Sequence, residues 1–159
     1  MILRRFLKRA DPTPLLTPQL YDERSFYTAF LNDLGMCKRE LILESPFITH
    51  KRMTALYPSL RRLTKRGVRI VINTRDPKEH NWRMEAEAEA AIASMQEIGV
   101  KVLFTDNHHR KLAIIDREVL YEGSLNILSQ NASCEVMRRI VSRQLVEQML
   151  DFLNIRTHF

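Results

Sequence analysis

Cysteine, glycine and proline are all scarce in this chain, and each scarcity excludes a class of protein. Its 159 residues include 2 cysteines, 4 glycines and 6 prolines. Cys37 and Cys134 form no CxxC spacing, so they support neither a zinc ribbon nor a disulfide framework and indicate ordinary thiols in a reducing compartment. The low glycine and proline content excludes a linker or a low-complexity chain.

Long apolar segments are also missing. No run of apolar residues approaches the ~20 that span a bilayer. The basic start at residues 1–9 lacks the uninterrupted apolar core of a signal peptide. We therefore expect a cytoplasmic protein without stable membrane association.

Positive charge and hydrophobic residues, by contrast, are plentiful. Hydrophobic residues make up 45% of the chain, which is enough for the core of a single domain. The formal net charge is +6 and the sequence pI is about 9.6. This surplus favours polyanionic partners such as nucleic acid or acidic membranes.

The chain divides into a short leading segment and one domain. Residues 1–20 combine the basic start with a connector, because three prolines fall within residues 11–18. Residues 21–159 form the domain. Hydrophobic periodicity predicts helices at 21–36 and 142–154. A helix is also predicted at 51–66, ending at Gly67, and another at 82–97, where the chain is rich in Glu and Ala. Leu145, Met149 and Phe152 share one face of the last helix.

The predicted strands complete an α/β domain with a mixed β-sheet flanked by helices. Apolar runs predict strands at 40–44, 68–73, 100–104 and 135–141. Two further strands, at 110–116 and 118–122, are separated only by Arg117, which predicts a tight hairpin. Residues 125–132 are expected to form a loop or a short helix.

Four side chains of chemical interest lie at the two ends of this hairpin. His109 and Lys111 are two positions apart, so on a strand they share a face. Ser124 and Asn126 follow the neighbouring strand. Lys and Asn side chains can stabilise charge on phosphoryl oxygens, and His can act as base, acid or nucleophile near neutral pH. The set therefore suits a phosphodiester.

Simpler interpretations exist for each part. A lone His beside a Lys is usually a surface pair, and Gly-Ser-x-Asn is a common turn composition. Asp116 lies an odd number of positions from His109, which predicts a turn or structural residue. Asp106, His108 and His109 could in principle bind a divalent ion, although adjacent strand residues face opposite ways. The combined spacing of the His-x-Lys and Gly-Ser-x-Asn segments favours the catalytic interpretation over these simpler ones.

That spacing resembles the HKD signature of the phospholipase D superfamily, which reads His-x-Lys, four residues, Asp, six residues, Gly-Ser-x-Asn. One copy of the motif is present, and its fixed positions are filled by His109, Lys111, Asp116, Gly123, Ser124 and Asn126. The resemblance covers about residues 21–154, where the element order and the Glu-Ser-Pro-Phe segment at 44–47 also fit. Within the superfamily, the chain looks most like the single-motif nucleases.

The resemblance implies a phosphodiesterase that uses a phosphohistidine intermediate and no metal or cofactor. One His attacks phosphorus, and a second protonates the leaving oxygen and then activates water. Lys111 and Asn126 would hold phosphoryl oxygens, Ser124 would support the site, and Glu135 would orient the His ring. Asp116 completes the motif. Because one motif supplies one His, we expect a homodimer with a shared site.

Nucleic acid is the expected substrate, with DNA ahead of RNA. The basic residues expected to bind it are Arg75, Lys78, Arg110 and Arg138. Trp82 or His80 could stack a base, although a solvated loop with Trp82 packed inward is the commoner outcome. The alternatives are a non-catalytic nucleic-acid-binding or assembly domain, and a phospholipid phosphodiesterase or transferase. A helicase or ATPase partner stays open.

Overall fold

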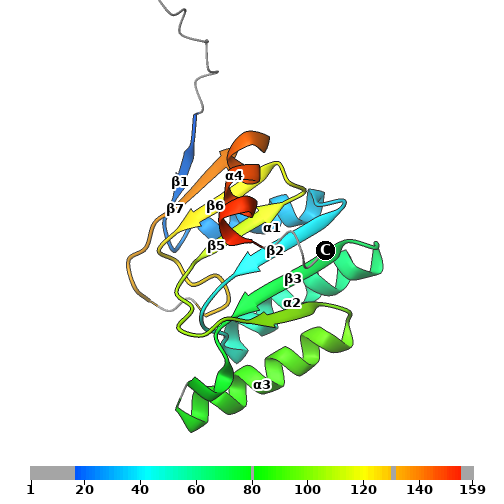
Figure 1. Cartoon of the computed structure of the whole chain (residues 1–159), viewed down its shortest axis with the longest axis vertical. Coiled ribbons are helices and arrows are strands. Elements are labelled where there is room, and N and C mark those ends of the chain that lie inside the picture. Colours follow the sequence, from blue (N-terminus) through cyan, green and yellow to red (C-terminus); the bar gives the residue numbers. More distant parts are fainter. Residues whose placement is uncertain (1–16, 80, 130–131, 155–159) are drawn as a thin grey trace, which may run out of the picture.

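One mixed sheet organises the protein. In this computed structural model the structure describes residues 17–79, 81–129 and 132–154. Seven strands lie in the order β1-β7-β6-β5-β2-β3-β4 (Figure 1). Their bounds are Gln19–Tyr21 (β1), Glu40–Glu44 (β2), Arg69–Thr74 (β3), Lys101–Phe104 (β4), Leu112–Ile115 (β5), Val119–Gly123 (β6) and Met137–Val141 (β7). β2, β3 and β4 are parallel, whereas the other pairings are antiparallel.

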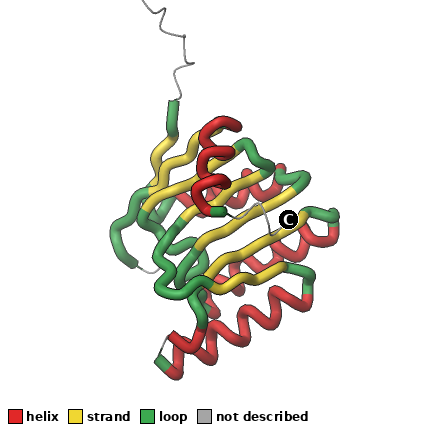
Figure 2. The backbone as a smooth tube through the Cα atoms, in the orientation of Figure 1, coloured by secondary structure: helices red, strands yellow, loops and turns green. Residues whose placement is uncertain are grey.

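Helices cover both faces of the sheet. α1 (Phe26–Met36), α2 (His50–Lys65) and α3 (Trp82–Glu97) lie on one side, and α4 (Arg143–Leu153) lies on the other (Figures 1 and 2). A short 3-10 helix, η1 (Pro77–Glu79), precedes α3. The larger core cluster lies under α1–α3, and a smaller one lies under α4. The expected α/β class and mixed sheet are confirmed.

Local sequence explains the central strands and the helix ends. All five residues of β2 are buried, which is typical of a strand with neighbours on both sides and helices on its faces. α2 and α3 connect the parallel strands as crossovers. Gly67 and Gly99 follow these helices with φ of +81° and +89°, a conformation that glycine adopts without strain.

The start of the domain differs from the sequence prediction. Residues 19–21 form β1, which pairs with β7, and the first helix begins at Phe26 rather than at 21. The Asp22 carboxylate accepts hydrogen bonds from the backbone N–H groups of Arg24 and Ser25. This turn separates the strand from the helix. The predicted connector at 11–18 falls mostly outside the described residues.

Two further details are corrected. Three residues, 116–118, connect β5 to β6; Asp116 and Arg117, both at positive φ, are the central residues of a type I′ turn that the Glu118 N–H closes on the Ile115 carbonyl oxygen at 3.0 Å. On α4 the buried residues are Val146, Leu150 and Leu153. Phe152, expected on the apolar face, is 76% exposed. Within the described ranges no helix has the length and apolar character needed to cross a membrane.

Candidate active site

The hairpin ends meet at one edge of the sheet. Gly123, the last residue of β6, donates its backbone N–H to the Lys111 carbonyl oxygen at 3.3 Å, and it pairs with Met137 of β7. The Ser124 N–H donates to the Val136 carbonyl oxygen at 2.9 Å. The strand pairing therefore places Lys111 next to Ser124, as the hairpin prediction required.

The motif glycine has a steric reason to be glycine. A Cβ atom at Gly123 would lie 2.1 Å from the Val136 carbonyl oxygen and 2.8 Å from the Met137 sulfur. A side chain here would push β7 away from β6. Gly123 thus sets how closely the Ser124 and Glu135 segments approach each other.

Ser124 and Glu135 form the second part of the site. The Ser124 hydroxyl donates to Glu135 and accepts from the Val136 N–H at 3.1 Å. Ser133 donates to the other Glu135 oxygen at 2.7 Å. These hydroxyl hydrogen bonds lower the pKa of Glu135. Among the described residues, the Glu135 carboxylate accepts from Ser124 and Ser133 and not from the His109 ring, so the expected orientation of that ring by Glu135 is not seen here.

Lys111 lies between Glu135 and His109. Its Nζ donates to the His109 carbonyl oxygen at 2.7 Å. Partial burial lowers the pKa of Lys111, and the negative charge of Glu135 opposes that shift. The ammonium is therefore held next to the candidate nucleophile, with one hydrogen bond fixing its direction.

His109 precedes β5 and is exposed. Its Nε2 lies 2.8 Å from an Arg75 Nη atom. A guanidinium can only donate, so Nε2 accepts and carries no proton. The Phe47 ring lies edge-on to the imidazole, with 6.4 Å between centroids. Arg75, expected to bind substrate, thus contacts His109 directly.

Asn126 lies three residues after β6, where its carbonyl oxygen accepts the Ser129 N–H at 3.0 Å in a turn. Its Oδ1 is buried and has no hydrogen-bond partner in the part of the chain that the structure describes. A buried, unpaired amide oxygen is costly in a protein interior.

A buried carboxylate lies below the site, and the sequence analysis did not single it out. Glu44, at the end of β2, is 0% exposed. It accepts hydrogen bonds from the Arg110 guanidinium and, at 3.0 Å, from the Asn73 amide. Arg110, expected to bind substrate, is therefore engaged with Glu44. A Glu at the end of a strand with three apolar residues in its middle was the available signal.

His108 is buried in the same place, at 2% exposed, whereas its neighbour His109 faces solvent. Its Nε2 lies 3.9 Å from Glu44, and burial lowers the pKa of His108. Neighbouring histidines that face opposite ways cannot share an ion with Asp106. No group of three or more His, Cys, Asp or Glu side chains suited to a metal occurs among the described residues.

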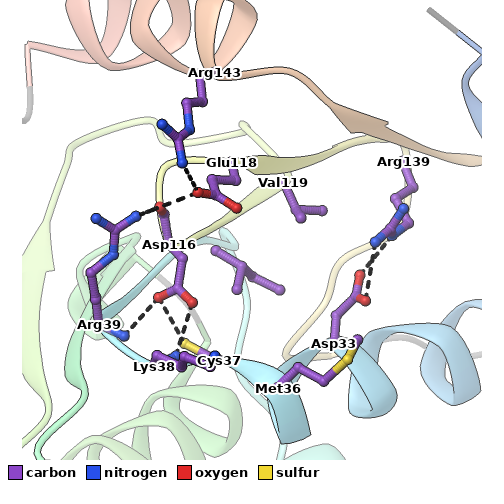
Figure 3. A pocket seen from close by; sticks show the side chains of 11 residues that line it. Asp33, Met36, Cys37, Lys38, Arg39, Asp116, Glu118, Val119, Arg139 and Arg143 are labelled. Carbon is purple, nitrogen blue, oxygen red and sulfur yellow. Dashed lines mark hydrogen bonds and ion pairs between the residues drawn. The ribbon is translucent and has the colours of Figure 1, made fainter.

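Asp116 lies at the opposite end of β5, away from the other motif residues. Its carboxylate accepts hydrogen bonds from the backbone N–H groups of Lys38 and Arg39 at 2.9 and 2.7 Å (Figure 3), and from that of Glu40 at 3.0 Å. Burial alone raises the pKa of Asp116, but these backbone hydrogen bonds outweigh it and lower the pKa overall. The geometry matches the predicted turn or structural role.

The remaining basic and aromatic residues lie around the site edge. Lys78 is exposed in η1. Arg138 is exposed on β7, 3.9 Å from Glu122, and it lines a cleft together with Lys111. Trp82 begins α3 and is 76% exposed, so it does not pack inward. His80 lies outside the described residues.

The sequence and the fold are both similar to those of known proteins. A family model described as "Cardiolipin synthase, PLD-like domain" matches residues 30–155. No curated protein sequence matches the chain. Among solved structures it is similar to Nuc from Salmonella typhimurium, described as a phospholipase D family member, with 20% identity and a TM-score of 0.70. That match covers 90% of this chain and 95% of that one.

Two other structures share the fold. NucT from Helicobacter pylori superposes with a TM-score of 0.71 at 15% identity, covering 90% of this chain and 96% of that one. A phosphatidylserine synthase from Haemophilus influenzae Rd KW20 has a TM-score of 0.69 at 16% identity, covering 87% of this chain and 38% of that one. At these identities the similarity establishes the fold.

Proposed function

Because this chain belongs to the phospholipase D-like family described as "Cardiolipin synthase, PLD-like domain", we propose that it is a metal-independent phosphodiesterase that cleaves nucleic acid. The observation that carries the proposal is the meeting of His109, Lys111 and Ser124 at one open edge of the sheet. An imidazole lone pair, an ammonium and a hydroxyl at one place are the groups that phosphoryl transfer through a covalent intermediate requires.

The proposed reaction proceeds in two balanced steps. The Nε2 lone pair of His109 forms a bond to phosphorus while the bond to the leaving oxygen breaks, and that oxygen takes a proton from a second His. Water then attacks the phosphohistidine, giving its proton to the second His, and Nε2 leaves. Lys111 and Asn126 stabilise the charge on the phosphoryl oxygens.

The second His is proposed to be His109 of a second copy of this chain. One imidazole cannot serve at once as nucleophile and as leaving-group acid, and His108 is buried below the site. A cleft of about 440 Å³ beside Lys111 supports this dimer, because its walls include the exposed apolar side chains Leu20, Val136 and Phe152. Exposed apolar surface of this kind favours burial against another protein surface.

The positive charge suits a polyanionic substrate, of which we place nucleic acid first. The net charge is +6, and the exposed cations Lys78 and Arg138 lie on elements that flank the site. A polyanion gains from neutralising several such cations at once. We place DNA ahead of RNA as the substrate to test first, with delivery by a helicase or ATPase as a further proposal.

The deciding experiment is cleavage of labelled single- and double-stranded DNA and RNA in EDTA, beside phospholipid vesicles. His109→Ala is the inactive variant and His50→Ala the matched control, since His50 is exposed on α2. We expect DNA cleavage by the wild type and the control, and none by His109→Ala. Vesicle turnover alone would identify a lipid enzyme, and DNA binding without turnover would identify a binding module.

A mixed-subunit experiment tests the shared site. Wild-type and His109→Ala chains with different tags are co-expressed and the mixed dimers purified through both tags. If the site is shared, the mixed dimers lose nearly all activity, because their one site then contains His109 from only one of the two chains. Mixed dimers that keep half the wild-type rate would show that each chain works alone.

A further inference from the structure

The Arg75–His109 contact goes beyond substrate binding. Arg75 follows β3, and its side chain is only 15% exposed. Three groups surround its guanidinium. His109 Nε2 is at 2.8 Å, Glu79 is 3.4 Å from Nε, and the centroid of the Phe47 ring is 5.5 Å from the guanidinium carbon. An arginine fixed from three sides has a defined position rather than a mobile one.

Glu79 ties this arginine to the loop that carries the candidate nucleophile. Its carboxylate accepts the Asn107 backbone N–H, with oxygens at 3.2 and 3.4 Å. Asn107 has a φ of +52°, and it lies two residues before His109. Glu79 therefore attracts the Arg75 guanidinium as an ion-pair partner, without a hydrogen bond to Nε, and also holds the backbone that leads to His109, while the terminal Nη atom reaches the ring.

This hydrogen bond selects one state of the imidazole. Since Arg75 donates to Nε2, a neutral ring carries its proton on Nδ1 and its available lone pair on Nε2. Nε2, the atom that must attack phosphorus, thus has the lone pair that the attack requires, but this lone pair accepts the Arg75 hydrogen bond. The same contact is incompatible with a proton on Nε2, so a His109 that acts as leaving-group acid must also be released from Arg75.

We propose that Arg75 is a positioning residue that holds the His109 lone pair on Nε2 until a phosphodiester binds, and then moves its guanidinium to the phosphoryl oxygens. The proposal deepens the proposed phosphodiesterase function and rests on it. The driving force is the negative charge of the phosphodiester, because a guanidinium can bind a phosphate group through two hydrogen bonds and a charge–charge attraction, whereas a neutral imidazole nitrogen accepts one hydrogen bond. The ion pair with Glu79 keeps the guanidinium near the site while its terminal Nη atom changes partner.

The first test reads the tautomer directly. Long-range ¹H–¹⁵N spectra of ¹⁵N-histidine protein, recorded where imidazoles are neutral, report which ring nitrogen carries the proton; a His109→Gln spectrum assigns the signals. We expect the Nδ1–H form of His109 in the wild type and in Arg75→Lys, which keeps a donor. Arg75→Met should lose it, and Arg61→Met, on the exposed face of α2, should not.

Inorganic phosphate is the probe for release. Titrating it into the wild type should move the His109 signals out of the Nδ1–H form, and in Arg75→Met phosphate should cause no comparable change. The proposal is overturned if Arg75→Met has the wild-type tautomer, or if saturating phosphate leaves the wild-type spectrum unchanged. Thermal unfolding of each variant checks that the fold is retained.

Turnover of bis(p-nitrophenyl) phosphate supplies the kinetic test. Arg75→Met should lower kcat by about 10²-fold, as for other donors to a developing oxyanion, with Arg75→Lys partly restoring it and Arg61→Met unaffected. A rise in KM at unchanged kcat would overturn the proposed role. If the wild type turns over no diester while the tautomer follows Arg75, the proposed function fails and the Arg75–His109 coupling stands.

Discussion

Replacing Asp116 by Asn should cost stability and leave the chemistry intact. The carboxylate accepts three backbone N–H groups, from residues 38–40, and hydrogen bonds to a charged group contribute about 1.5–3 kcal/mol each. An Asn keeps one carbonyl oxygen for the Arg39 and Glu40 donors, but its NH₂ group faces the Lys38 N–H. One charge-assisted hydrogen bond is lost where water has partial access, so we expect a loss of about 2 kcal/mol.

Asp116→Ala should cost more, because φ at this position is +54°. Asn tolerates the left-handed region, whereas Ala is disfavoured there by about 1–2 kcal/mol. Urea unfolding of both variants measures these losses, which correspond to roughly 2–4 °C in Tm per kcal/mol for a domain of this size. Asp106→Asn, on an exposed turn residue, is the matched control.

The refuting result is a stable but inactive variant. If Asp116→Asn unfolds at the wild-type urea concentration and has lost diester turnover, Asp116 acts on the chemistry and the structural role is wrong. If stability falls by about 2 kcal/mol and turnover of the folded protein is unchanged, Asp116 stabilises the fold at one end of β5, and the chemistry belongs to the motif residues at the other end.

The pH dependence of this contribution has a definite sign. The folded-state pKa of Asp116 lies below its ordinary value of 3.8, so the unfolded chain takes up a proton first as the pH falls. The stabilisation is complete well above that value and is lost as the pH falls through the folded-state pKa. The stability difference between wild type and Asp116→Asn should therefore shrink in acid.

Three further predictions concern other parts of the fold. Gly123→Ala should destabilise by about 1–3 kcal/mol in urea unfolding, since the new methyl group would overlap the Val136 carbonyl oxygen; wild-type stability would contradict this. Glu44→Gln should lower the unfolding free energy by about 2 kcal/mol, less than for a fully buried ion pair because its arginine partner is 39% exposed; an unchanged Tm would exclude this role. Burial raises the pKa of Cys37 to about 12, so iodoacetamide near neutral pH should modify exposed Cys134 first in the native protein. Mass spectrometry measures the order of modification, and Cys37 reacting first would contradict the prediction.

The sequence was most informative where the signal is local or repeats at a fixed interval. An apolar run predicted β2 at residues 40–44, and a Glu- and Ala-rich segment predicted α3 at 82–97, both with the observed bounds. The parity of Asp116 relative to His109 correctly predicted a turn residue, because alternate strand positions face opposite sides. Motif spacing also predicted that Lys111 and Ser124 lie together, since a hairpin aligns its two ends.

Other features were undetermined because two local answers were equally good. On α4, both Leu145–Met149–Phe152 and Val146–Leu150–Leu153 have helical spacing, and only packing on β5 and β6 selected the second set. The three-residue strand β1 is too short to show a period and depends on pairing with β7.

The contacts that define the candidate site arise only in three dimensions. Glu44 meets Arg110 across 66 residues, and Arg75 meets His109 across 34, because β2 and β3 end, and antiparallel β5 begins, at the same edge of the sheet. A charged residue in sequence has no partner until the fold places one beside it. The sequence alone therefore determined which chemical groups are present and which of them share the hairpin. The tertiary structure alone decided that Arg110 pairs with the buried carboxylate of Glu44 and that Arg75 donates a hydrogen bond to the His109 ring.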